Sequence, residues 1–255
     1  PIGGTGEYAA LSDDERVQVV KICVEVSAGQ VPVVAGVLST GFEDAVTSGR
    51  RFIENGADAL LLLTPYYTPG PQDGIANYFR KYKTAVDGPI LLYEIPRKTN
   101  VSITADTIKA LADDGTIIGM KCCSDDVAEF IRAAHLVDGK IALLGGEEPL
   151  FSAHMALGAC GGILASANII PEKWIEVYET VRNGKLQDAL KLQAEIDPLV
   201  KLAFSEANPG PLKEMLSING FECGVPRLPL VPTSASTSAK ISALMLKYFP
   251  VNGNG

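Results

Sequence analysis

The sequence predicts an α/β fold, a (β/α)8 barrel followed by a C-terminal helical region, from three observations. Short apolar runs alternate with longer amphipathic segments, which is typical of repeated βα units and a parallel sheet. The chain has 255 residues, 47% of them hydrophobic, and can bury one large core. After Pro171 the strand-like runs stop and helical patterns continue. We therefore expect an incomplete barrel over residues 1–170 and a packed helical region over residues 171–255.

The individual elements follow from these patterns. The apolar runs with the length of strands cover residues 31–37, 59–63, 89–93, 117–121, 141–144 and 161–165. The segments between them are long enough for crossover helices. Ser12 and Glu15 form a capping box that predicts the start of the first helix. In the C-terminal region the predicted helices cover residues 172–182, 186–205, 211–218 and 236–247, joined in part by stiff proline-rich links.

The predicted strands and a stub at Pro1 and Ile2 do not complete an eight-stranded barrel. Such a barrel would lack its first strand, its first helix and most of its second strand. Either the chain is truncated ahead of Pro1, or the barrel is completed in another way. An open edge would expose unpaired backbone groups.

Composition excludes several classes of function. A net charge of -8 and a pI near 4.9 argue against nucleic acid or an anionic membrane surface as the partner, since both demand a basic face. The longest apolar stretches are shorter than the ~20 residues that span a bilayer, and no leader opens the chain. The five cysteines show no CxxC spacing, and their odd number favours reduced thiols over a disulfide framework. We expect a cytoplasmic protein.

Metal-dependent chemistry is also disfavoured by the sequence. The two histidines, His135 and His154, have no partner at the spacing of metal ligands. The GxSxG pattern of many Ser-His-Asp hydrolases is missing as well. We therefore expect no metal and no cofactor.

Lys121 is the strongest candidate for a catalytic residue. It closes the apolar run at residues 117–121, and residues 124–126 after it have the chemistry of a helix start. An amine between a buried strand and a helix is partly desolvated, which lowers its pKa and provides a neutral nucleophile near pH 7. A Schiff-base lysine needs this property. The alternative is a lysine that only carries its charge into water.

Other polar residues follow neighbouring strands, at the face where α/β barrels carry their active sites. Tyr93 could transfer protons beside a lysine-bound intermediate, or it could be a core aromatic residue. Arg97 and Lys98 could bind a carboxylate of the substrate, or they could belong to a solvated loop.

Glycine-rich turns occur at the same face. The turn Gly3-Gly4-Thr5-Gly6-Glu7 would let backbone amides approach a ligand carboxylate, although such turns are often simple loop geometry. Two glycine pairs, at residues 145–146 and 161–162, could hold a phosphate or give the substrate clearance from the backbone.

In combination these segments resemble the dihydrodipicolinate synthase and N-acetylneuraminate lyase family. The resemblance covers essentially the whole chain, in order and at consistent spacing. It is carried by Gly3-Gly4-Thr5-Gly6-Glu7, Thr64-Pro65-Tyr66-Tyr67, Tyr93-Glu94-Ile95-Pro96, Gly119-Met120-Lys121, Gly145-Gly146-Glu147-Glu148 and Ala167-Asn168. It implies a class I aldolase-type lyase on a TIM barrel with a C-terminal helical extension, usually tetrameric and independent of metal.

The same resemblance implies roles for single residues. Lys121 would be the Schiff-base lysine for pyruvate or a related 2-oxo acid, and Tyr93 the proton-transfer residue beside it. Tyr67 would reach into the site of a neighbouring subunit as part of a proton relay. The residues implied to bind the substrate are Gly4, Thr5, Arg97, Lys98, Gly146 and Ile163.

Three positions depart from the family pattern. Gly4 stands where the synthases usually carry a threonine of the relay, so that hydroxyl is missing. Lys98 aligns with an arginine that grips the second substrate, and Arg97 lies one residue earlier. Glu94 follows Tyr93 where asparagine is more usual. The segment at residues 208–213, Asn-Pro-Gly-Pro-Leu-Lys, resembles the NPxPxK motif of the synthase branch.

The expected function is therefore a Schiff-base lyase or synthase that acts on a 2-oxo acid, with a condensation of pyruvate and an aldehyde as the first candidate. An aldolase or dehydratase of 2-keto-3-deoxy sugar acids, or a related deaminase, is the first alternative. A non-catalytic barrel that binds small acids, or an inactive fragment, is the second. The expected assembly is a homo-oligomer, a tetramer or dimer of dimers.

Overall fold

The computed structural model describes residues 1–249, which form two compact units, one over Pro1–Ile163 and one from Leu164 onward. The first unit contains the sheet and the second is helical. The short 3-10 turn η3 (Ser166–Asn168) belongs to the second unit, where Ser166 Oγ accepts a hydrogen bond from the indole N–H of Trp174 at 2.8 Å.

The sheet of the first unit has six parallel strands, and each strand pairs with the next one in the chain. They are β1 (Val34–Val37), β2 (Ala59–Leu63), β3 (Ile90–Glu94), β4 (Gly119–Cys122), β5 (Ala142–Gly145) and β6 (Gly161–Gly162). This strand order is that of consecutive units in a (β/α)8 barrel. The α/β fold predicted from the alternating pattern is confirmed.

Strand bounds differ from the predicted runs where pairing partners end. The run predicted at 161–165 is a strand over only two residues, since only Gly161 and Gly162 pair with β5. The N–H of Gly36 donates to the carbonyl of Pro1 at 3.0 Å, so the predicted stub adds one backbone bond beyond β1. Among the described residues, β1 and β6 are the end strands of the ladder.

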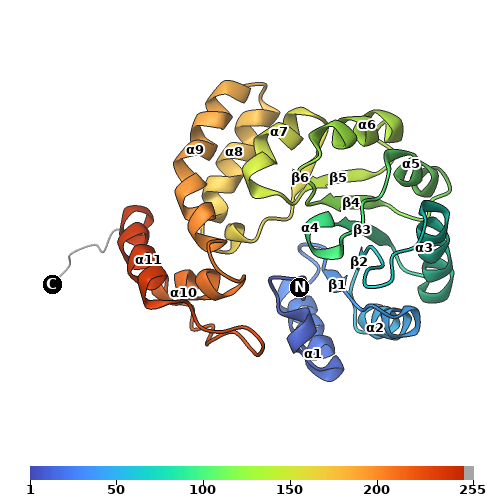
Figure 1. Cartoon of the computed structure of the whole chain (residues 1–255), viewed down its shortest axis with the longest axis horizontal. Coiled ribbons are helices and arrows are strands. Elements are labelled where there is room, and N and C mark those ends of the chain that lie inside the picture. Colours follow the sequence, from blue (N-terminus) through green and yellow to red (C-terminus); the bar gives the residue numbers. More distant parts are fainter. Residues whose placement is uncertain (250–255) are drawn as a thin grey trace. The chain divides into compact units, whose positions relative to one another are not determined.

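The helical elements of the first unit are η1 (Tyr8–Ala10), α1 (Asp13–Ser27), α2 (Phe42–Glu54), α3 (Gln72–Val86), α4 (Pro96–Thr99), α5 (Ala105–Asp113), α6 (Val127–Val137), η2 (Glu148–Leu150) and α7 (Phe151–Ala156). Helices α2, α3, α5 and α6 follow one another around the outer side of the sheet (Figure 1). The capping box predicted at Ser12 and Glu15 is present at the start of α1.

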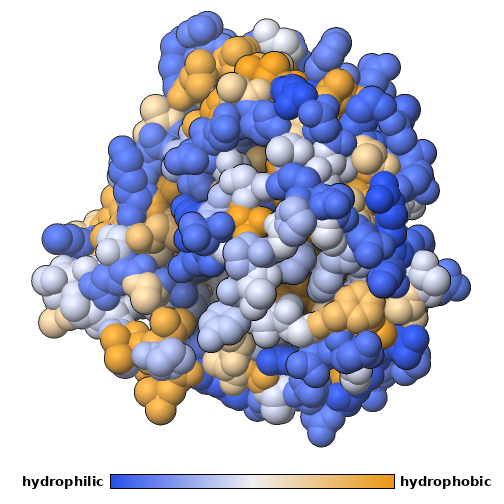
Figure 2. All heavy atoms as spheres, turned by 45° about the vertical axis from the view of Figure 1, so that its right-hand side comes forward, coloured by the Kyte–Doolittle hydropathy of each residue, from blue (hydrophilic) through white to orange (hydrophobic). Residues whose placement is uncertain are grey.

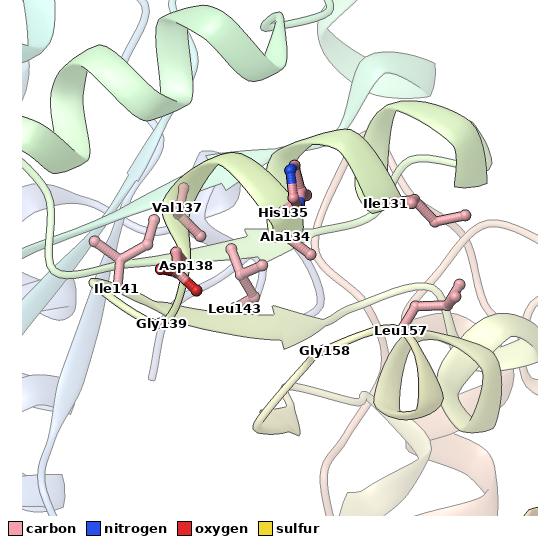
Figure 3. A pocket seen from close by; sticks show the side chains of 10 residues that line it. All are labelled: Ile131, Ala134, His135, Val137, Asp138, Gly139, Ile141, Leu143, Leu157 and Gly158. Carbon is pink, nitrogen blue, oxygen red and sulfur yellow. The ribbon is translucent and has the colours of Figure 1, made fainter.

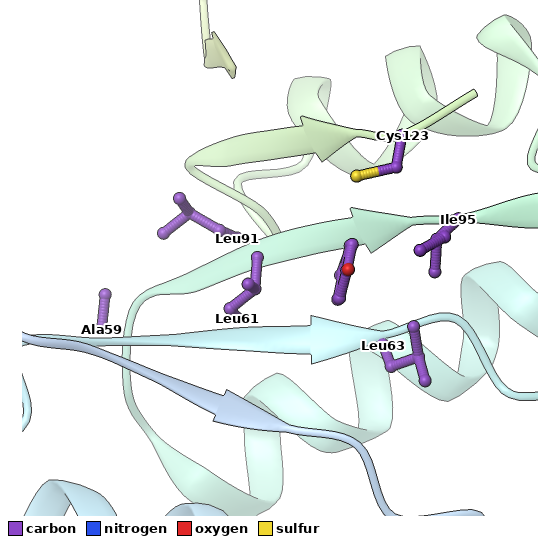
Figure 4. Packing of buried hydrophobic residues seen from close by; sticks show 7 residues of the cluster. Ala59, Leu61, Leu63, Leu91, Ile95 and Cys123 are labelled. Atoms are coloured by element: carbon purple, nitrogen blue, oxygen red, sulfur yellow. The ribbon is translucent and has the colours of Figure 1, made fainter. Parts of the chain in front are cut away.

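The two faces of the sheet carry different side chains, because successive residues of a strand point to opposite sides. Leu60, Leu62, Ile90, Leu92 and Met120 on the helix-facing side are at most 1% exposed. The inner face carries a second apolar cluster, shown in Figure 4, of Ala59, Leu61, Leu63, Leu91, Tyr93, Ile95 and Cys123. Tyr93 thus belongs to the inner face and its neighbour Glu94 to the helix-facing side.

The second unit contains four further helices, as the pattern after Pro171 predicts. They are α8 (Pro171–Arg182), α9 (Leu186–Ala203), α10 (Gly210–Ile218) and α11 (Ala235–Tyr248). Helices α8 and α9 pack together, as do α10 and α11. The hydroxyl of Tyr248 donates to the carbonyl of Glu195 at 2.6 Å, which ties α11 to α9.

The surface shown in Figure 2 is mostly hydrophilic, with hydrophobic residues gathered in separate patches. Tyr67, 89% exposed, is the most exposed large hydrophobic residue of the first unit. None of the helices within residues 1–249 is both long and apolar enough to cross a membrane.

Candidate active site

The amine of Lys121 lies over the ring of Tyr93, with 4.6 Å between Nζ and the ring centroid. Strand pairing produces this contact, because Lys121 in β4 is the register partner of Tyr93 in β3. Paired residues of neighbouring parallel strands point to the same side of the sheet. The side chain of Lys121 is half-buried, and that of Tyr93 is buried.

Burial sets the protonation state of the Tyr93 phenol. Desolvation raises its pKa far above the ordinary value, and the nearby Cys123 raises it further. At neutral pH the hydroxyl is therefore protonated, and it can donate a proton or a hydrogen bond to a developing negative charge.

Cys123 is a member of this site that the sequence analysis did not identify. Its sulfur lies within hydrogen-bonding reach of the Tyr93 hydroxyl. Burial raises the pKa of the thiol, and the positive charge of Lys121 partly offsets the shift. A cysteine at the end of an apolar run is indistinguishable in sequence from an ordinary core residue.

Gly146 is brought to the same place by its backbone. Its N–H donates to the carbonyl of Cys122 at 2.7 Å. A Cβ at this position would stand 2.4 Å from Cys123 Sγ and 2.7 Å from Lys121 Cε. Glycine is therefore required here for the lysine side chain to keep its position.

Arg97 and Lys98 lie on the short helix α4, directly after the strand that carries Tyr93. Arg97 forms an ion pair with Glu147, with 3.3 Å between Nη1 and Oε2. Burial raises the pKa of Glu147, and Arg97 partly offsets this. Lys98 is exposed. Glu147 belongs to a segment that resembles the family, but no role was predicted for it, because an acidic loop residue has no distinctive spacing.

Of the remaining predicted residues, Gly4 and Thr5 lie in the turn ahead of η1, and Ile163 lies directly after β6. Gly4 is exposed, and a Cβ there would find no atom within 4 Å. Thr5 is half-buried in the same turn. Ile163 follows β6, and its N–H donates to the carbonyl of Gly145 at 2.9 Å.

Tyr67 has an unusual conformation. Its φ of 67° lies in the left-handed region that non-glycine residues rarely adopt. Its side chain is 89% exposed, so it does not contribute to the buried Lys121 and Tyr93 pair within its own chain.

A groove of about 380 Å³ lies elsewhere on the first unit (Figure 3). It is lined by the end of α6, including His135 and Asp138, by Ile141 just ahead of β5, and by Leu157 and Gly158 ahead of β6. These positions precede their strands, whereas the lysine and the phenol lie toward strand ends. Catalytic chemistry in barrels sits at the carboxyl ends of strands, so this groove is not the candidate site.

The fold and the site together define an α/β barrel enzyme with a lysine amine beside a buried phenol. The sequence model of the dihydrodipicolinate synthetase family matches residues 1–247. The chain belongs to this family.

Individual relatives agree with the family match. The chain is 35% identical over its whole length to the 4-hydroxy-tetrahydrodipicolinate synthase of Methanothrix thermoacetophila, covering 86% of that protein. It resembles the dihydrodipicolinate synthase of Acinetobacter baumannii complexed with pyruvate, with a TM-score of 0.91, 32% identity and coverage of 96% of this chain and 84% of that one. A monomeric dihydrodipicolinate synthase variant has a TM-score of 0.92 and 27% identity, with coverage of 96% and 83%.

Proposed function

We propose that this chain is a Schiff-base synthase that condenses pyruvate with an aldehyde, as in 4-hydroxy-tetrahydrodipicolinate synthesis. The observation that carries the proposal is the Lys121 amine 4.6 Å from the centre of the Tyr93 ring, on the inner face of the sheet. An amine nucleophile and a buried proton donor are the two groups that this chemistry needs.

The proposed reaction begins with attack of Lys121 Nζ on the keto carbon of the 2-oxo acid. Loss of water gives an iminium, which withdraws electrons as a metal ion would. A proton then leaves the adjacent carbon, and the resulting enamine forms a carbon–carbon bond with the aldehyde. Hydrolysis of the new iminium releases the product and returns the amine. Tyr93 donates and accepts the protons of these steps.

Substrate binding is assigned to the groups around this pair. Amides of the turn that contains Gly4 and Thr5 would hold the carboxylate of the 2-oxo acid. Arg97, the guanidinium beside Glu147, is the proposed anchor for a carboxylate on the second substrate, with Lys98 as an additional charge. Gly146 and Ile163 would line the space for the ketone.

Borohydride trapping tests the proposal. Reduction of the wild-type protein with pyruvate present is expected to add one pyruvate-derived mass to the peptide that contains Lys121. Lys121→Ala should abolish this adduct, and Lys109→Ala, which changes an exposed lysine of α5, should retain it. Tyr93→Phe should still form the adduct but turn over about 10²- to 10⁴-fold more slowly. An unmodified Lys121 in the folded wild-type protein would refute the proposal.

A second candidate reaction is the cleavage or dehydration of 2-keto-3-deoxy sugar acids. The missing relay hydroxyl at Gly4 favours it, because the synthases usually carry a threonine at that position. Both reactions form the same adduct at Lys121, so borohydride trapping does not distinguish them. An assay with a panel of aldehydes and sugar acids does.

A homo-oligomer in the cytoplasm completes the proposal. The exposed and conformationally unusual Tyr67 is the proposed contribution of one subunit to the site of another. A reducing compartment suits the five free cysteines.

A further inference from the structure

The carboxyl group of Glu94 is buried behind the candidate site and has no part in the chemistry described above. Glu94 is the last residue of β3, directly after Tyr93, and its side chain points to the helix-facing side of the sheet. It is only 4% exposed. A buried carboxyl of this kind needs hydrogen-bonding partners or a bound proton.

Two partners contact the two carboxyl oxygens. The hydroxyl of Thr64, just after β2, lies 3.2 Å from Oε2. The backbone N–H of Ile103, in the loop between α4 and α5, donates to Oε1 at 3.1 Å. Glu94 therefore joins the end of β2 and the loop after α4 to the strand that carries Tyr93.

The geometry around Thr64 indicates which form of the carboxyl fits. The single hydroxyl proton of Thr64 has two acceptors in reach, Glu94 Oε2 and the carbonyl of Tyr93 at 3.1 Å. If Glu94 is ionised, these acceptors compete for one proton. If Oε2 carries a proton, it donates to Thr64 Oγ1, and the threonine hydroxyl donates to the Tyr93 carbonyl. Every donor and acceptor in this chain of hydrogen bonds then has a partner.

Among the described residues that line a cavity of about 40 Å³ beside Glu94, none is positively charged. The titratable groups there are Cys122 in β4, Asp126 just ahead of α6 and Glu129 in its first turn. Asp126 accepts the N–H of Glu129, and Glu129 accepts the N–H of Ala105 and forms an ion pair with Arg132, with 3.7 Å between Oε1 and Nη1. Burial raises the pKa of Glu94 to about 7, and the hydrogen bonds from Ile103 and Thr64 partly offset the shift.

We propose that Glu94 acts in its protonated form as a positioning residue, which fixes the Tyr93 strand end and the loop behind α4 through a hydrogen-bond chain. The inference rests on the proposed function, because α4 carries Arg97 and Tyr93 is the proton-transfer residue. Loss of the proton from Glu94 breaks the hydrogen-bond chain. It favours states of the loop between α4 and α5 in which the Glu94 carboxylate reaches water. The site is therefore less well held above neutral pH.

Glu94→Gln is the sharpest test, because glutamine has the shape of the protonated acid and cannot ionise. Its amide N–H donates to Thr64 and its oxygen accepts from Ile103. The ratio of kcat/KM between Glu94→Gln and the wild type, measured against pH, cancels the pH effects that both proteins share. This ratio is expected to rise by at least about tenfold between pH 6 and pH 9, mainly through KM for the aldehyde substrate. A ratio that is constant with pH, or that falls, would overturn the proposal.

Two controls isolate the contribution of the Glu94 proton. Thr64→Val keeps the side-chain volume but removes the hydroxyl that links Glu94 to the Tyr93 carbonyl. In this background, the further change Glu94→Gln should no longer raise activity at high pH. The melting temperature of Glu94→Gln relative to wild type should also increase as the pH rises from about 4.5 to about 7, because in this range the unfolded wild type loses the Glu94 proton while the folded protein keeps it. This readout needs no substrate. If borohydride trapping fails while the pH-dependent melting difference is present, the proposed function is wrong and the role of Glu94 as a protonated link stands. A melting difference that does not change with pH would show that Glu94 is not a protonated link.

Discussion

At the scale of single residues, the candidate site depends on how close the backbone allows groups to approach. Lys121, Tyr93 and Cys123 occupy one inner face, and Gly146 closes the space beside them without a side chain. The inner face is tightly packed at this point, so one added methyl group would displace the neighbouring side chains.

Gly146→Ala tests this packing. The new Cβ would overlap Cys123 Sγ and Lys121 Cε, at 2.4 and 2.7 Å, and would displace the lysine side chain. We expect the yield of the pyruvate adduct at Lys121 to fall by about tenfold or more, since overpacking costs about 1–3 kcal/mol.

Gly161→Ala is the matched control, because its Cβ would meet its nearest atom at an ordinary 3.5 Å. The adduct yield of this variant is expected to stay near that of the wild type. Equal yields in Gly146→Ala and Gly161→Ala would show that Gly146 does not position the lysine.

Prediction from sequence succeeded at residue scale where chemistry and strand position coincide. The pattern placed Lys121 and Tyr93 at strand ends on one face, and the register of β3 and β4 confirms this. It did not identify Cys123 or assign Glu147 a role, because a buried thiol and a loop carboxylate look like common structural residues. The function of Glu94 was also open, since its partners Thr64 and Ile103 come from separate loops.

At the scale of elements, helices α2 and α3 show how closely the outer layer is packed. Gly49 of α2 faces Tyr82 of α3, whose hydroxyl donates to the carbonyl of Ala45 at 3.1 Å. A Cβ on Gly49 would stand 2.0 Å from that hydroxyl oxygen. Tyr82 is fully buried.

Gly49→Ala is therefore expected to lower stability by about 1–3 kcal/mol, although alanine favours helices over glycine. Gly74→Ala in α3, where the nearest atom would lie at 3.4 Å, should instead stabilise slightly. Tyr82→Phe removes the clashing oxygen, so the double variant Gly49→Ala and Tyr82→Phe should be less destabilised than the sum of the single changes. Denaturant unfolding of the four variants measures this, and strict additivity would contradict the proposed clash.

Element positions were predicted better than their ends. All six strands occur where apolar runs predicted them, but β4 starts at Gly119 and β6 ends at Gly162. The ends of parallel strands depend on pairing partners that come from distant crossovers, and a local pattern does not contain that information.

At the scale of the whole molecule, Tyr67 is the residue that we propose to connect the fold with assembly. Its left-handed backbone and exposed ring present an aromatic hydroxyl to the surroundings of the chain. Strained conformations of this kind are retained at functional sites. If Tyr67 completes the site of a second copy, activity is a property of the assembly.

Subunit mixing tests this arrangement. Lys121→Ala and Tyr67→Phe should each be poorly active alone. After co-refolding in equal amounts, a mixed pair of subunits contains one site with both native residues, so about a quarter of wild-type activity should return. The wild type treated in the same way is the control. Activity that does not return, or Tyr67→Phe with the wild-type rate, would show that the subunits do not complete each other's sites.

The register between β3 and β4 has a consequence for how this catalyst can change over evolutionary time. Backbone ladder bonds, and not surface loops, determine the spacing of the amine and the phenol. Loops after the strands can therefore accumulate substitutions while the amine and the phenol stay aligned. New substrate preferences can arise on this scaffold with the bond-making step inherited intact.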